Sequence, residues 1–156
     1  MKLLGFLDPK AIVTNLEDCS KEAAVRKLVD AAATTGAFKD SDKEAIVEQV
    51  MAREMTGTTG LGGGVALPHV KGTEHVTELC GAFGRSVEGI DFDAVDGQPV
   101  HVLFLILSPA DARERHIEIL RRISEIRENE HYLSSFKRAD GADGLARLIG
   151  TVGGSS

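Results

Sequence analysis

The sequence has no apolar run long enough to cross a membrane and no surplus of positive charge. A membrane-spanning helix needs about 18 consecutive apolar residues, and no stretch of this chain approaches that length. The formal net charge is −6, which disfavours nucleic-acid binding, because phosphates are neutralised by clustered Lys and Arg. The apolar stretch over residues 1–7 is too short for a signal peptide and ends at Asp8-Pro9. We expect a cytoplasmic protein with no nucleic-acid partner and no direct membrane insertion.

Cysteine is also scarce, and the usual catalytic and metal-binding motifs are absent. Cys19 and Cys80 show no CxxC spacing, so we expect two free thiols that serve in packing. The five histidines form no HExxH pair, and no Cys/His combination has the spacing of zinc ligands. The G-x-S-x-G elbow of serine hydrolases is missing as well. The sequence therefore predicts no metal site and no cofactor.

The spacing of apolar residues predicts both helices and strands. Helical spacing indicates three long helices and two short ones, over residues 20–35, 41–55 and 109–127 and near residues 133–136 and 145–149. The second long helix begins with a capping box, Ser41 to Glu44. Apolar and β-branched runs predict strands over residues 65–67, 79–85 and 100–107, the last of them central in its sheet.

This order of elements predicts one α/β domain. At 156 residues, 42% of them hydrophobic, the chain has the size and composition of a single soluble domain. We expect a three-layer-like sandwich with a central mixed β-sheet flanked by helices. Residues 1–150 would form this domain, and residues 151–156 a disordered Gly/Ser tail.

The most informative segment is glycine-rich and ends on a histidine: residues 57–69 read GTTGLGGGVALPH. Glycines let backbone N–H groups surround an anion without interference from side chains, and Pro68 fixes the backbone before His69. The segment is not a P-loop, because no Lys-Ser or Lys-Thr follows the glycines. It also fails the GxGxxG fingerprint, because Val65 stands where the third glycine belongs. Both motifs need a strand before the loop, whereas a helix precedes it here, so a nucleotide-binding loop is excluded.

His69 and His116 are the two histidines with a candidate chemical role. A histidine after proline at a strand end is by itself more often a half-exposed loop residue, but consecutive glycines are costly unless their backbone conformation is needed. His116 lies on the buried face of the third long helix. There it is either a satisfied core residue or an N–H donor to a second imidazole or a phosphoryl group. His101 is expected to be structural, and His75 and His131 to be exposed.

Several separated motifs resemble one family. They are Arg53-Glu54, residues 59–69, residues 90–100, and Leu107-Ser-Pro-Ala110 followed by His116. In this order they resemble the type 2 (fructose/mannitol/nitrogen-regulatory) enzyme IIA domain of the bacterial phosphoenolpyruvate-dependent sugar phosphotransferase system. The resemblance covers essentially residues 1–150, which would form a single enzyme IIA-like domain with an α/β sandwich around a mixed sheet.

The resemblance implies a phosphoryl carrier. His69 matches the histidine phosphorylated by the histidine-containing phosphocarrier protein, His116 a second active-site histidine, and Arg53 an active-site arginine. The phosphoryl group would pass to a IIB domain, or regulatory target proteins would read the phosphorylation state. The glycine segment would supply further phosphate-binding groups, at Thr59, Gly62, Gly63 and Gly64, without a metal.

Two positions depart from the family pattern and keep other functions open. Val70 follows the Pro-His pair where a small residue is usual, and Gly63 replaces an Asn or acidic residue. A signalling or regulatory binding module that has kept the fold and lost phosphotransfer is therefore one alternative. A domain that binds a small phosphate ester through its glycine segment is the other.

Overall fold

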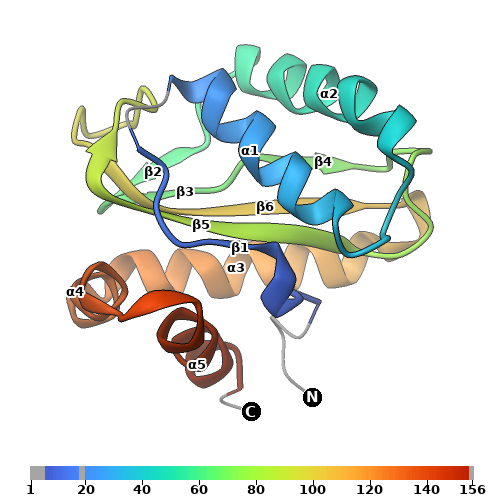
Figure 1. Cartoon of the computed structure of the whole chain (residues 1–156). Coiled ribbons are helices and arrows are strands. Elements are labelled where there is room, and N and C mark those ends of the chain that lie inside the picture. Colours follow the sequence, from blue (N-terminus) through green and yellow to red (C-terminus); the bar gives the residue numbers. More distant parts are fainter. Residues whose placement is uncertain (1–5, 18–19, 155–156) are drawn as a thin grey trace.

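A computed structural model describes residues 6–17 and 20–154 of the chain, and its centre is one mixed β-sheet. The strand order is β1-β5-β6-β3-β2, and β4 pairs with β6 farther along that strand (Figure 1). β5 is antiparallel to β6, whereas β3 and β4 are both parallel to it. The strands are β1 (Ile12–Val13), β2 (Gly60–Gly62), β3 (Val65–Ala66), β4 (His69–Lys71), β5 (Cys80–Ile90) and β6 (Val100–Ser108).

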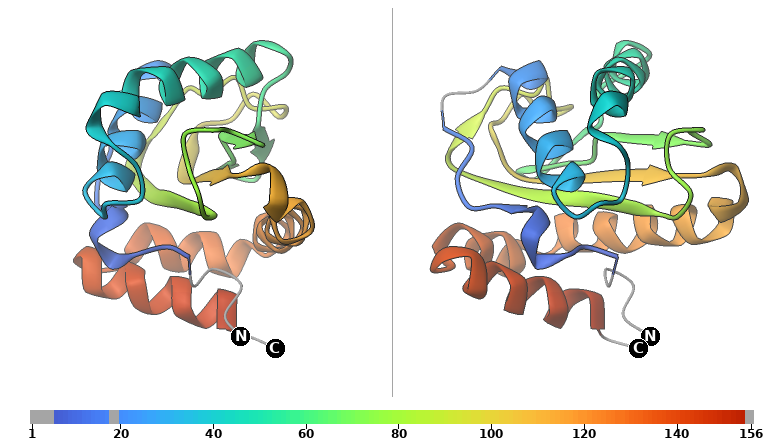
Figure 2. Two further views of the ribbon diagram at one scale, coloured as in Figure 1. Left: turned by 90° about the vertical axis from the view of Figure 1, so that its right-hand side faces the viewer. Right: turned by 45° about the vertical axis from the view of Figure 1, so that its right-hand side comes forward.

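Helices cover both faces of this sheet. α1 (Lys21–Ala33) and α2 (Lys43–Met55) lie on one face. α3 (Arg113–Glu128), α4 (Glu130–Arg138) and α5 (Gly141–Gly154) lie on the other, as the turned views show (Figure 2). Short 3₁₀ turns span Pro9–Ala11, Asp40–Asp42 and Ala110–Ala112. The predicted α/β sandwich with a central mixed sheet is confirmed.

The central strand β6 separates two hydrophobic cores, because successive side chains of a strand point to opposite faces. One set of its residues packs with α1 and α2, namely Leu103, Leu105 and Leu107. The alternate set packs with α3, α4 and α5, namely Val102, Phe104 and Ile106. Each of these six side chains is fully buried. The nearly unbroken apolar run that predicted a doubly covered strand is therefore explained by burial on both faces.

The predicted capping box of α2 is wrong. α2 begins at Lys43, and Asp40–Asp42 form a 3₁₀ turn before it, without a side-chain cap. Glu44 instead forms a bidentate ion pair with Arg26 of α1, at 2.7 and 2.8 Å. A contact with the neighbouring helix thus replaces the local bond that the sequence pattern favoured.

Two further expectations change in detail, and the one for Cys80 holds. The strand expected over residues 79–85 continues to Ile90. Helix α5 includes residues 151–154, which we had expected to be disordered, while residues 155–156 lie outside the described part of the chain. Cys80 is a half-buried free thiol whose pKa is raised by burial to about 11, which suits packing rather than chemistry. Cys19 lies outside the described residues.

A buried arginine ties the C-terminal helices to the sheet. Arg85 in β5 is only 7% exposed. Its Nε donates to the Thr14 carbonyl at 2.9 Å, and its Nη1 donates to the carbonyls of Phe136 (3.1 Å) and Ala139 at the end of α4. Within residues 6–17 and 20–154 no carboxylate pairs with this guanidinium. Cations favour the C-terminal end of a helix, where carbonyls lack helical partners.

We expect Arg85→Met to lower the free energy of unfolding by about 3 kcal/mol, because it leaves buried carbonyls without donors. Urea denaturation followed by circular dichroism measures this change. Arg122→Met is the matched control, because Arg122 forms a part-exposed i,i+3 pair with Glu125, which contributes about 0.5 kcal/mol or less. Equal stability of the two variants would contradict the structural role of Arg85.

Candidate functional site

The structure brings together the two histidines singled out from the sequence. His69 is the first residue of β4, and His116 lies in the first turns of α3. Their ring centroids are 5.4 Å apart, and the rings are tilted by 56°. His69 is 7% exposed and His116 is fully buried. They meet because His69 pairs with Ile106, whose side chain faces α3.

The His69 ring is held through Nδ1. This nitrogen lies 2.8 Å from the Leu67 carbonyl oxygen. A carbonyl can only accept, so Nδ1 carries the hydrogen and Nε2 of the neutral ring keeps its lone pair. Burial is the main cause that lowers the pKa of His69, and the positive charges of Arg53 and Lys71 lower this pKa further. The hydrogen bond to Leu67 acts in the opposite direction and raises it only in part. The ring is therefore neutral near pH 7.

His116 is held in a similar way by a side chain. Its Nδ1 lies 2.5 Å from the hydroxyl oxygen of Ser108, the last residue of β6. Its Nε2 is buried and has no hydrogen-bond partner in the described part of the chain. Burial lowers the pKa of His116 to about 4, with smaller contributions from His69 and Lys71. This ring is neutral as well, with one polar atom left unsatisfied beside His69.

Two cationic side chains lie close enough to act on these rings. Arg53 stands in the last turn of α2, as expected. Its Nη1 donates to the Gly57 carbonyl (2.9 Å) and to the Thr56 hydroxyl (3.2 Å). Lys71 is exposed in β4 and lowers the pKa of both histidines. The positive charge thus lies at the rim of the site, while the two imidazoles are buried and neutral.

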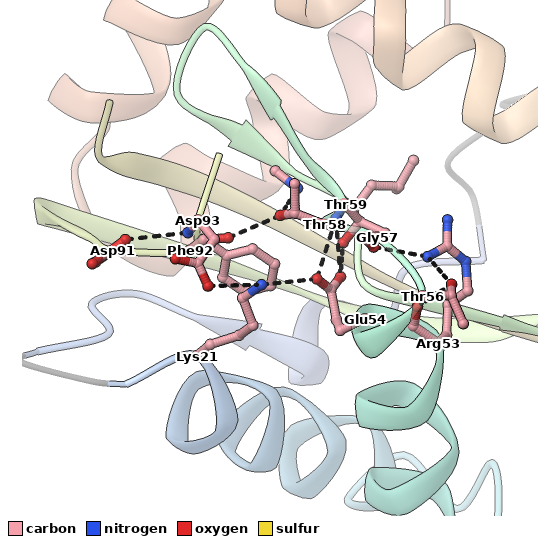
Figure 3. A network of polar contacts seen from close by, with 12 residues as sticks. Lys21, Arg53, Glu54, Thr56, Gly57, Thr58, Thr59, Asp91, Phe92 and Asp93 are labelled. Carbon is pink, nitrogen blue, oxygen red and sulfur yellow. Dashed lines mark hydrogen bonds and ion pairs between the residues drawn. The ribbon is translucent and has the colours of Figure 1, made fainter. Parts of the chain in front are cut away.

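A buried carboxylate anchors the segment that leads into the site (Figure 3). Glu54 is 6% exposed. It accepts from Lys21 Nζ at 3.0 Å, from the Thr59 backbone N–H and from the Thr59 hydroxyl. Lys21 Nζ also lies 3.6 Å from Asp93 and 4.6 Å from the centroid of the Phe92 ring. The buried carboxylate is tolerated because Lys21 compensates its charge and the N–H and hydroxyl of Thr59 donate to it.

This anchor is connected to His69 by backbone hydrogen bonds. The carbonyl of Thr59, held by Glu54, accepts from the Leu67 N–H at 3.0 Å. The carbonyl of Leu67 in turn binds Nδ1 of His69, and the carbonyl of Pro68 accepts from the Ile106 N–H at 3.1 Å. The orientation of His69 therefore depends on residues that belong to α2, the glycine segment and β6.

The structure does not bring the expected phosphate-binding glycines to His69. Gly62, Gly63 and Gly64 all have positive φ, from 65° to 88°, and form the tight connection of the β2–β3 hairpin. The Gly64 carbonyl binds the N–H of Val102, whereas His69 pairs with Ile106. Four residues of a strand span about 13 Å. The glycine conformation serves a tight turn rather than an anion site beside His69.

The hydrogen-bond donors of Gly63 and Thr59 are also already occupied. The Gly63 N–H donates to the Asp96 carboxylate at 3.1 Å. The backbone N–H groups of Gln98 and Gly63 both lower the pKa of this carboxyl by donating to it. The N–H and the hydroxyl of Thr59 both donate to Glu54. We therefore leave Thr59, Gly62, Gly63 and Gly64 out of the set of groups that contact a phosphoryl group.

The other histidines lie apart from this pair. His101 in β6 is half-buried, and its Nδ1 bonds to the Ser86 carbonyl at 2.9 Å, as a structural residue would. His75, expected to be exposed, is half-buried between Asp42 (3.3 Å) and Glu74 (3.0 Å). His131 is exposed in α4.

Sequence reasoning missed Lys71, Ser108 and the role of Glu54. Lys71 follows His69 by two residues in the same strand, a spacing that places both on one face, so its proximity was predictable. The pairing of Lys71 with Ser108 depends on strand register. Within the described residues no cluster of three or more His, Cys, Asp and Glu could hold a metal ion. No helix in that same part of the chain is long and apolar enough to span a membrane.

Comparison with known proteins places this chain in a family. The family model for the EIIA 2 component of the phosphoenolpyruvate-dependent sugar phosphotransferase system matches residues 5–151. The fructose-specific EIIA component of Haloferax volcanii is 39% identical over 124 residues, which cover 80% of this chain and 73% of that protein. The fructose-specific EIIABC component of Bacillus subtilis is 34% identical over 96% of this chain. The chain spans only 23% of the length of that protein.

Solved structures show the same fold. The nitrogen regulatory protein IIA-Ntr of Neisseria meningitidis matches with a TM-score of 0.83 and 29% identity, over 94% of this chain and 98% of that one. Enzyme IIA for mannitol from Escherichia coli, in its complex with phosphorylated enzyme IIB, matches with a TM-score of 0.74 and 19% identity. That match covers 93% of this chain and 97% of the other. The chain therefore belongs to the EIIA 2 family of the phosphoenolpyruvate-dependent sugar phosphotransferase system.

Proposed function

We propose that the protein is a phosphoryl carrier that accepts a phosphoryl group on Nε2 of His69. The observation that carries this proposal is the bond between Nδ1 of His69 and the Leu67 carbonyl. It leaves Nε2 as the nucleophilic atom of a neutral, oriented ring beside His116. Membership of the EIIA 2 family supports the same chemistry.

The donor in this proposal is the histidine-containing phosphocarrier protein. The P–N bond to the donor's histidine breaks as a P–N bond to Nε2 of His69 forms. His69 keeps its hydrogen on Nδ1, bound to the Leu67 carbonyl, so no proton has to leave the acceptor ring. In the second transfer the P–N bond to Nε2 of His69 breaks as a bond forms between phosphorus and a nucleophilic side chain of a IIB domain. The solved complex of a mannitol IIA with phosphorylated IIB supports this acceptor class.

The charges around His69 suit a loose transition state in which positioning and charge stabilisation do most of the work. Lys71 and Arg53 supply positive charge without a metal, since both act on the His69 ring. Nη1 of Arg53 donates to Thr56 and Gly57 of the protein itself. The remaining N–H groups of the planar guanidinium suit the oxygens of a phosphoryl group. His116 adds a buried ring whose Nε2 is unsatisfied within the described residues.

The two departures from the family pattern lie away from the reacting atom. Gly63 belongs to the β2–β3 hairpin, which lies beside Val102 of β6, whereas His69 lies beside Ile106 of the same strand. Val70 packs with the core formed by α1 and α2, whereas His69 faces α3. Neither residue favours the alternatives of a binding module without phosphotransfer or a phosphate-ester site. The proposal includes a regulatory role, in which target proteins respond to the phosphorylation state; the name of the Neisseria protein suggests such a role for that protein. It also includes a cytoplasmic location.

We expect acid-labile phosphate on the protein after incubation with phosphoenolpyruvate, enzyme I and the phosphocarrier protein. His69→Ala should abolish the label, because it removes the nucleophilic nitrogen. Intact-mass spectrometry at neutral and acidic pH measures the label. His131→Ala, at an exposed histidine of α4, is the matched control and should label like the wild type.

Two results would count against the proposal. Full labelling of His69→Ala would place the phosphoryl group on another residue. If the phosphocarrier protein is phosphorylated and the wild type still carries no label, the proposal is wrong. The non-catalytic binding module would then be the favoured function.

The anchor at Glu54 should affect transfer more than a remote packing change does. Thr59→Val removes the hydroxyl that donates to Glu54 and loosens the segment that orients His69. We expect a roughly tenfold or greater loss of the single-turnover rate of His69 phosphorylation, with a loss of about 1–2 kcal/mol in stability. Rapid-quench kinetics measures the rate. Thr59→Ser keeps the hydroxyl and should restore the rate; equal rates for both variants would exclude this positioning role.

The depressed pKa of His116 predicts a dependence of stability on pH. The ordinary pKa of about 6.5 applies to the unfolded chain, whereas the folded value is about 4, so the unfolded state binds more protons in between. Stability is therefore lost as pH falls from about 6.5 towards 4. In His116→Gln this part of the loss should be absent. The stability difference between the two proteins should change by about 2–3 kcal/mol across that window, as urea denaturation at several pH values would measure. A difference that does not vary with pH would contradict the low pKa.

A further inference from the structure

The unsatisfied atom in the site is Nε2 of His116. The ring is fully buried, and its other nitrogen, Nδ1, lies 2.5 Å from the Ser108 hydroxyl oxygen. A neutral imidazole has one N–H donor and one lone-pair acceptor, and the nitrogen that carries the hydrogen depends on the partner of the other. The chemistry open to Nε2 therefore depends on which way the bond between His116 and Ser108 runs.

The Ser108 hydroxyl is itself buried, with 1% of the residue exposed. Its hydrogen needs an acceptor, because leaving a buried polar group unpaired is destabilising. Within residues 6–17 and 20–154, the only hydrogen bond of this hydroxyl is the one to Nδ1 of His116. The backbone carbonyl of Ser108 is already used by the Thr73 N–H, at 3.0 Å.

The two directions of this bond differ in what they leave at Nε2 of His116. If Nδ1–H donates to Ser108, Nε2 keeps a lone pair and the serine hydrogen is unpaired. If the serine hydroxyl donates to Nδ1, the serine hydrogen is paired and Nε2 carries a hydrogen. Each direction leaves one donor without a partner, but only the second presents Nε2 as a donor to the proposed phosphoryl group on His69, whose ionised oxygens accept hydrogen bonds. We propose that Ser108 is a positioning residue whose hydroxyl donates to Nδ1 of His116 and so fixes the hydrogen on Nε2.

This assignment gives the two active-site rings opposite tautomers. His69 carries its hydrogen on Nδ1 because its partner is the Leu67 carbonyl, and His116 carries its hydrogen on Nε2 because its partner is a hydroxyl. One ring is thus a nucleophile at Nε2 and its neighbour a donor at Nε2. Resting on the proposed phosphorylation of His69, the consequence is that His116 donates to a phosphoryl oxygen as a neutral group. The phosphoryl group then satisfies the buried N–H of His116, which has no partner among the described residues of the free protein.

Long-range ¹H–¹⁵N correlation spectra of the unphosphorylated full chain at pH 7 test the tautomers directly, because protonated and unprotonated ring nitrogens differ in chemical shift. We expect His116 protonated at Nε2 and His69 protonated at Nδ1. Ser108→Ala should release His116 to a mixture of tautomers or to the Nδ1–H form. Ser108→Thr keeps a hydroxyl and should restore the wild-type pattern.

The rate of His69 phosphorylation supplies a second readout. We expect Ser108→Ala to lose roughly tenfold in rate, less than the 10²–10³ measured for loss of a whole oxyanion donor, because the ring itself remains. Ser108→Thr should recover most of this loss. Unchanged ¹H–¹⁵N backbone resonances in α5 and β1, on the remote side of the fold, show that the variants remain folded.

The outcomes separate this inference from the proposed function. Wild-type His116 protonated at Nδ1 would overturn the role of Ser108, whether or not His69 is phosphorylated, and this measurement needs no variant to fold. An unchanged tautomer in Ser108→Ala would overturn it as well. Failure of His69 to accept phosphate from the phosphocarrier protein would sink the proposed function, while the spectra of the free protein would still decide the tautomer.

Discussion

The position of every group in the site depends on the central strand β6. Its side chains are buried on both faces, so a shift of one residue in register would place each apolar side chain in the wrong core. β6 therefore fixes β4 through the pairs of His69 with Ile106 and Lys71 with Ser108. The strand ends at Ser108, and one 3₁₀ turn leads the chain into α3 and His116. The side chains of His69, Ser108 and His116 thus meet at the C-terminal end of a strand that is buried on both faces.

The second constraint acts on the backbone before His69. Pro68 separates two short strands that both pair with β6, and a proline has no N–H to offer a neighbouring strand. The segment is held instead by its neighbours: Thr59 binds the Leu67 N–H, and Glu54 binds Thr59. The buried carboxylate is expensive to desolvate, and its location next to Arg53 links the orientation of the arginine to that of the histidine. The same network thereby connects the end of α2, where Arg53 lies, with His69 in β4.

The helices and the central strand could be predicted from the sequence because their signals are local and periodic. Helix α1 and strand β6 show this directly: their apolar spacing matches their burial. The glycine segment could not be assigned in this way. Three consecutive glycines suit either an anion-binding loop or a tight hairpin turn, and the choice depends on the packing of Arg127 and Leu133 against Gly63 and Gly64. Such contacts come from helices more than sixty residues later in the chain.

The candidate site was predictable in its residue types but not in its hydrogen bonds. His69, His116 and Arg53 stood out by motif, and the structure places the two histidines in contact. The partner of His69 Nδ1 is the Leu67 carbonyl, only two residues away. The pairing of His116 with Ser108 depends instead on where β6 ends and on the direction of α3, which no pattern within a single segment reveals. Ser108 at the end of an apolar run looked like an ordinary strand terminus.

The electrostatics of the site follow from a division between buried and exposed groups. A phosphoryl group needs positive charge near it, yet a protonated imidazole has no lone pair on either nitrogen and cannot attack. Burial holds both rings neutral, which the lowered pKa values of His69 and His116 express. The charge is placed instead on Lys71 and Arg53, long side chains that keep their cationic ends near water. Because those charges themselves lower the pKa of His69, they help to keep its ring neutral, and in the proposed transfer they would also attract the anionic phosphoryl group.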